Sequence, residues 1–119
     1  MSLLNDDQVV VRLLGMQGLD ARTRQALQKI ATLRSDVTAR TAELERAKGQ
    51  REGAERTEQR VRDNLGAVPA NDAMHGKLVR QLEAEEARIA ALDKAIEQAE
   101  ATVAKAREAL AAAVGTLTL

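Results

Sequence analysis

The residues that could support chemistry in this chain are few and far apart. His75 is the single histidine, and there is no cysteine. A metal site needs several ligands, and Asn71 and Asp72 near His75 form a poor set for zinc or iron. Arg51 and Glu85 carry the charges of an acid and base pair, but no surrounding motif indicates a pocket. The sequence therefore predicts no catalytic residue, no metal, no cofactor and no small-molecule substrate, so the chain is not expected to be an enzyme.

A second group of polar residues lies in the middle of the chain and forms a candidate interaction surface. Its arginines have the chemistry to contact phosphate or an acidic protein. Acidic residues are interspersed among them, so a solvated helix face of mixed charge is the favoured interpretation. The candidate interaction surface comprises Arg56, Arg60, Arg62, Asn64 and His75.

An unbroken heptad pattern runs through the second half of the chain and indicates the element that positions these residues. Alternating steps of three and four residues place apolar residues along one side of an α-helix, which must be buried against another helix. The positions of this seam are Leu78, Leu82, Glu85, Ile89, Leu92, Ile96, Ala99, Val103, Ala106, Leu110, Ala113 and Leu117.

The first half carries a poorer seam of the same period, which supplies the partner helix. Between the halves, Gly66 suits a left-handed residue after a helix end, Pro69 breaks the helix, and Asn71 or Asp72 caps the next one. The arms are expected at about 20–65 and 72–114, with the tip at 66–71, and Asp20 is expected to cap the start of the first arm. The positions of the first seam are Ala26, Ile30, Leu33, Val37, Arg40, Leu44, Ala47, Arg51, Ala54, Glu58, Val61 and Leu65.

The predicted fold is all-α, a long antiparallel two-helix coiled-coil hairpin with a short N-terminal helix. Residues 1–18 form a leader and this short helix, which is expected from Asn5 to Gly15 and covers the open end of the hairpin. A strand is the alternative there, because Val9–Val11 are β-branched. Residues 19–119 form the hairpin, in which Gly115 is expected to interrupt the second arm.

The size of the seam residues predicts how the two arms align. The expected alignment sets small residues against large ones in most layers, for example Ala26 against Leu110. It also sets Arg51 opposite Glu85, the one acidic residue of the second seam, as an ion pair that fixes the register.

Two further features leave alternatives open. The segment 48–53 contains two glycines, which weaken an α-helix. It is either a hinge or docking segment, or part of a long helix that tolerates a weak segment because its partner holds it. Alanines outside the second seam fit either packing against a neighbouring hairpin in a four-helix assembly or high helix propensity. These alanines are Ala84, Ala87, Ala90, Ala91, Ala101, Ala104, Ala111 and Ala112.

Composition argues against several classes of function. The chain of 119 residues has no aromatic residue, which disfavours carbohydrate, nucleotide and single-stranded nucleic-acid sites. Its net charge of +0 argues against a general polyanion binder. No apolar run is long enough to span a membrane, and charges surround the seam instead of forming one cationic face for a lipid surface.

The segment Glu58–Pro69, followed by Leu78–Leu82 and Glu85–Leu92, resembles the C-terminal part of a bacterial domain-of-unknown-function family whose members are often labelled mucoidy inhibitor A homologues. The most specific likeness is at Gln59–Leu65. The resemblance implies that the hairpin belongs to a larger protein with β-rich domains upstream, and that the cell envelope or periplasm is its compartment. It supplies no catalytic residue, and Met74–Lys77 departs from an aromatic and basic pair in relatives.

The leading hypothesis is a non-enzymatic structural or protein-interaction arm, which spaces adjoining domains or mediates self-association. Its expected partners are proteins, either the chain's own upstream domains or a second copy in a homodimer. The alternative is a nucleic-acid-contacting helical arm, which the balanced charge does not favour.

Overall fold

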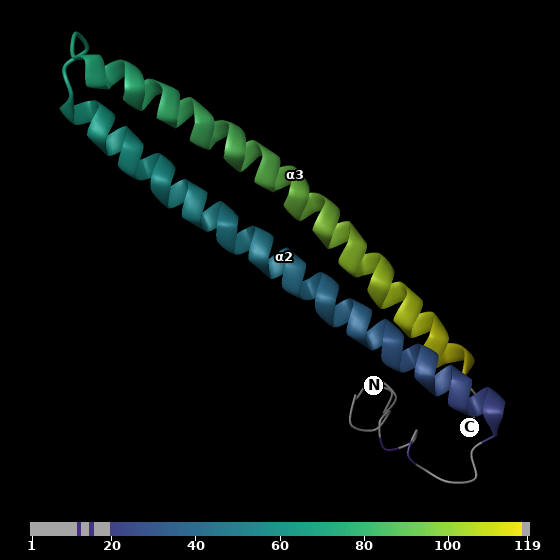
Figure 1. Ribbon diagram of the computed structural model, residues 1–119. Coiled ribbons are helices and arrows are strands. Elements are labelled where there is room, and N and C mark those ends of the chain that lie inside the picture. Colours follow the sequence, from purple (N-terminus) through teal and green to yellow (C-terminus); the bar gives the residue numbers. More distant parts are fainter. Residues whose placement is uncertain (1–11, 13–14, 16–19, 118–119) are drawn as a thin grey trace. The chain divides into compact units, whose positions relative to one another are not determined.

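The computed structural model describes Arg12, Gly15 and residues 20–117, and its two helices form a hairpin. Helix α2 spans Ala21–Ala67 and helix α3 spans Ala73–Thr116, with a short loop between them (Figure 1). The predicted all-α fold of two long helices packed against each other is confirmed. The predicted short helix from Asn5 to Gly15 lies outside the described residues, except for Arg12 and Gly15, as do the last two residues of the chain.

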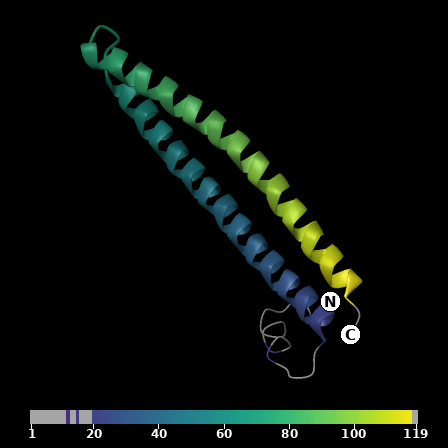
Figure 2. The ribbon, with the colours of Figure 1, turned by 45° about the vertical axis from the view of Figure 1, so that its right-hand side comes forward.

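The chain divides into two compact units, each containing a segment of both helices. Unit 1 pairs α2 up to Glu43 with α3 from Ala99 onward, and unit 2 comprises Leu44–Gln98 with the loop. Within each unit the two helix segments lie side by side and run in opposite directions (Figure 1, Figure 2).

Burial along both helices follows the predicted seams. Every predicted seam position on α2 and on α3 is buried or half-buried, whereas most positions between them are exposed. One buried residue, Leu27, lies outside the prediction, next to the half-buried seam residue Ala26. The heptad pattern therefore identified the packed face of each helix, because only one side of a helix can face a single partner. The buried hydrophobic residues are Leu27, Ile30, Leu44, Ala54, Val61, Leu78, Val103 and Ala106.

The loop between the helices is built around Pro69 and Asp72. The backbone N–H of Met74 donates to Asp72 Oδ1 at 2.9 Å, so Asp72, rather than Asn71, caps α3. Gly66 was expected to end the first arm in a left-handed conformation, and this is wrong: α2 continues through Gly66 to Ala67. Pro69 explains the difference, because a proline disfavours helical backbone in the preceding residue, here Val68.

The second arm is also longer than predicted. Gly115 was expected to interrupt it, but α3 runs through Gly115 and ends at Thr116. The Thr116 hydroxyl donates to the Ala113 carbonyl at 3.1 Å and satisfies one of the acceptors that a helix end leaves open.

The glycine-containing segment 48–53 is helical throughout, within α2. A Cβ built on Gly49 meets no atom within 4 Å, and one built on Gly53 meets only Arg56 Nη2 at 3.7 Å. Neither glycine is required by a close approach of another group. The helical backbone of this segment matches the alternative of a long continuous helix that tolerates the two glycines.

Asp20 caps the start of α2, as its position before the first arm indicates. The backbone N–H of Thr23 donates to Asp20 Oδ1 at 2.7 Å, and this hydrogen bond lowers the pKa of Asp20 below its ordinary value of 3.8. Because the folded-state pKa is the lower one, the charged cap stabilises the folded state above about pH 3.8, and this contribution is lost as the pH falls through the folded-state value.

We therefore expect the first turn of α2 to loosen in acid below about pH 3.8 when Asp20 is protonated. An NMR titration of the Thr23 amide reports this locally, where the many other carboxyl groups do not interfere. In Asp20→Asn, the side-chain oxygen still accepts the hydrogen bond but does not titrate, so the acid-dependent change at Thr23 should disappear. An unchanged titration in that variant would contradict the assignment.

Candidate interaction surface

Arg51 lies on the seam of α2 in unit 2 and joins two carboxylates. Its Nε donates to Asp93 Oδ1 on α3 and its Nη1 to Glu55 Oε1 on its own helix. The hydrogen bond to Asp93 raises the pKa of the Arg51 guanidinium above its usual value. The predicted ion pair between Arg51 and Glu85 is wrong, because Arg51 contacts Asp93 about two helical turns further along α3.

The alignment of the helices is displaced in the same direction within each unit. In unit 2, Arg51 reaches Asp93 instead of Glu85. In unit 1, Ala26 lines a hollow with Thr116 and Leu117, whereas the expected alignment set it against Leu110. These contacts fit a slip of about one heptad, which keeps the same seams in contact while changing which layers meet. Residue size alone did not distinguish the two alignments.

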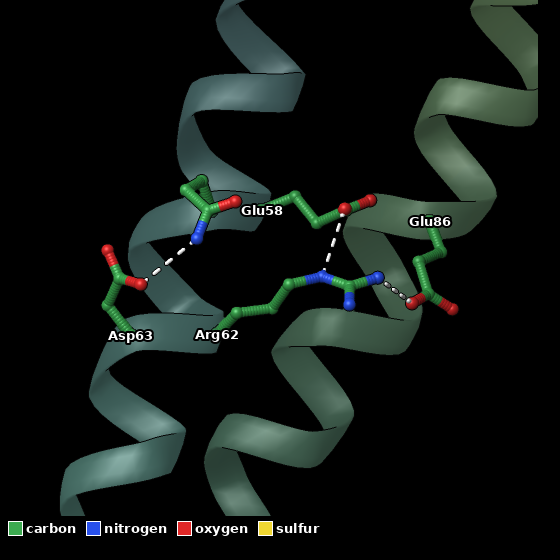
Figure 3. A network of polar contacts seen from close by, with 5 residues as sticks. Glu58, Arg62, Asp63 and Glu86 are labelled. Carbon is green, nitrogen blue, oxygen red and sulfur yellow. Dashed lines mark hydrogen bonds and ion pairs between the residues drawn. The ribbon is translucent and has the colours of Figure 1, made fainter.

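Arg62 lies at the centre of a polar network on one edge of the unit 2 interface, where it joins α2 to α3 (Figure 3). Its Nε donates to Glu58 Oε1 at 3.1 Å and its Nη2 to Glu86 Oε1 at 3.2 Å. Gln59 donates to Asp63 alongside at 3.0 Å. Arg62 is therefore occupied by carboxylates on both helices, which reduces its capacity to bind phosphate.

The other predicted surface residues fall into two groups. Arg56 is exposed and forms no hydrogen bond or ion pair within the described residues, while His75 is half-buried and its backbone N–H donates to the Asp72 carbonyl at 3.0 Å. Arg60 and Asn64, in contrast, lie together on the edge opposite Arg62, where Arg60 Nη2 is 3.5 Å from Thr57 Oγ1. The structure thus divides the predicted surface between two edges of unit 2.

A groove of about 340 Å³ opens between α2 and α3 at the edge that carries Arg60 and Asn64. Glu85 reaches into this groove from the seam of α3. Its Oε2 is buried and has no hydrogen-bond partner. We call this feature the Glu85 groove. Its lining residues are Thr57, Arg60, Val61, Asn64, Gln81, Ala84 and Glu85.

Sequence reasoning missed the groove, although a signal for it exists. The flanking heptad positions on the Arg62 edge carry charges that pair across the helices, as Arg62 and Glu86 do. On the opposite edge, the equivalent positions that line the groove hold uncharged side chains, Thr57, Asn64 and Gln81. Uncharged residues leave an open edge because they cannot bridge the helices with ion pairs.

No family model, curated protein or solved structure matches the chain. The resemblance to mucoidy inhibitor A homologues therefore stays a prediction. Within the described residues, no helix has an apolar stretch sufficient to cross a membrane. In that same part of the chain, no three His, Asp or Glu side chains gather where they could hold a metal ion. The fold therefore places this chain in the class of all-α helical hairpins, and polar residues lie along both edges of its helix interface in unit 2.

Proposed function

We propose that the chain is a non-enzymatic protein-interaction arm that associates with a second copy of itself. The observation that supports this proposal most directly is the incomplete burial of the seam in unit 2. Of the large aliphatic seam residues of α3 there, Leu78 is buried, but the other four are only half-buried: Leu82, Ile89, Leu92 and Ile96. Two helices cover only one side of each other, and further helices in a bundle complete the burial of such residues.

The ion pairs of unit 2 also favour a protein partner over nucleic acid. Arg51 and Arg62 already contact carboxylates. Binding to a phosphate backbone depends on many cations acting together, and the arginines that remain are interspersed with acidic residues. Spacing of adjoining domains is the other role of such an arm, and it requires no contact between copies. The resemblance described above adds the proposal that these domains are β-rich and that the protein lies in the cell envelope.

Sedimentation equilibrium of the whole chain over a wide concentration range tests self-association. Interference optics are needed, because a chain without aromatic residues hardly absorbs at 280 nm. We expect a mass above the 12.9 kDa of one chain that survives moderate salt, since apolar burial is not screened. A mass of one chain at every concentration would overturn self-association and leave the spacing role. Gel retardation of RNA at low salt would instead favour the nucleic-acid hypothesis.

A further inference from the structure

We infer that the Glu85 groove is the face on which a second copy of this chain docks, with Arg88 of each copy paired to Glu85 of the other. This inference rests on the proposed self-association and adds the contact surface and its charges. It starts from the unpaired carboxylate oxygen. Glu85 Oε2 is buried without a hydrogen-bond partner, which is unfavourable unless a donor arrives from outside.

Arg88 is the donor that this chain can supply. It is exposed, and within the described residues it forms no hydrogen bond or ion pair. It follows Ala84 by one turn, so it lies on the same face of α3 that lines the groove. An arginine brings five N–H donors on a long apolar stem, which suits a groove that has Val61 beside a carboxylate.

The spacing of the two residues makes the contact self-complementary. Glu85 and Arg88 are three residues apart, a rise of about 4.5 Å along the helix. When two copies of α3 pack antiparallel about a two-fold axis between these positions, Glu85 of each copy lies opposite Arg88 of the other, so both ion pairs form at once.

The rest of this face allows close approach. Ala84, Ala91 and Ala95 lie along the same side of α3 as Arg88, and all three are exposed. Their small side chains let a second helix come near enough for an arginine to enter the groove. The opposite edge is less suitable, since Arg62 and Glu86 already close it with an ion pair.

The test uses charge reversal on the whole chain, measured by sedimentation equilibrium. We expect Glu85→Arg and Arg88→Glu each to raise the dimer dissociation constant at least tenfold, because each change places like charges opposite one another in both pairs. A mixture of the two variants should regain the dimer, since Arg at 85 then faces Glu at 88. Lys94→Glu and Glu97→Arg are matched controls with the same spacing on the exposed side of α3 away from Ala84 and Arg88, and they should leave the constant unchanged.

Three results would overturn the inference. The first is a wild type that dimerises while the charge reversals have no effect, and the second is a mixture that does not regain the dimer. In both cases the copies associate through another face, and only the assignment of the groove fails. A wild type that stays monomeric refutes both the assignment and the proposed self-association. Far-UV circular dichroism accompanies each sample. The mixture must regain both mass and helicity, so poor folding of one variant alone does not hide the result.

Discussion

Replacement of Ile30 with alanine is expected to lower the free energy of unfolding by about 2–4 kcal/mol. Ile30 is fully buried on the seam of α2 in unit 1. The substitution removes apolar contacts and leaves a cavity at the interface of the two helices. Urea unfolding followed by circular dichroism at 222 nm measures the change, since the chain has no aromatic residue for fluorescence.

The matched control for Ile30 is its neighbour Lys29, which is exposed. Lys29→Ala should change the free energy of unfolding by less than about 0.5 kcal/mol, because both residues are good helix formers and no packing is lost. If the two variants were equally stable, the seam in unit 1 would not be the packed face that burial indicates.

The double substitution Gly49→Ala and Gly53→Ala is expected to raise the free energy of unfolding by about 2 kcal/mol. Both glycines lie inside α2, where alanine restricts the unfolded chain and favours the helix by about 1 kcal/mol at each position. The added methyl groups meet no obstacle, since the nearest contact is the flexible end of Arg56 at 3.7 Å from the Cβ of position 53.

Gly66→Ala is the comparison for this prediction. A Cβ there also meets nothing within 4 Å, but Gly66 lies in the last turn of α2, where fewer helical hydrogen bonds depend on it. We expect a smaller gain than at either internal glycine. A loss of stability in the double variant would show that the segment 48–53 needs its glycines, as a hinge or docking segment would.

Several features of the fold could be predicted from local sequence because they depend on local chemistry. The period of seven identified the packed side of both helices, and the capping oxygens of Asp20 and Asp72 identified where the helices begin. The helix ends were less predictable. Gly66 and Gly115 are both helical, since glycine permits a left-handed end without requiring one.

The residues predicted for one surface do not lie on one edge. Arg60 and Asn64 were selected for that surface, whereas Glu85 was selected as the ion-pair partner of Arg51, and the structure brings Arg60, Asn64 and Glu85 together in one groove. Arg62 was selected for the same surface but lies on the opposite edge, where Glu58 and Glu86 bind it. A charge cluster in the sequence does not reveal which edge of an interface each residue joins, because neighbours on a helix point in different directions.

By itself, the sequence determined that this protein is a helical hairpin, which side of each helix is packed and that a loop containing Pro69 separates the two helices. Only the tertiary structure decided the alignment of the two seams, and with it the pairing of Arg51 with Asp93 and the unpaired oxygen of Glu85. The physical reason is the repeat itself. A slip of one heptad returns the same seam positions to the interface, so the two alignments differ only in long-range contacts between particular layers.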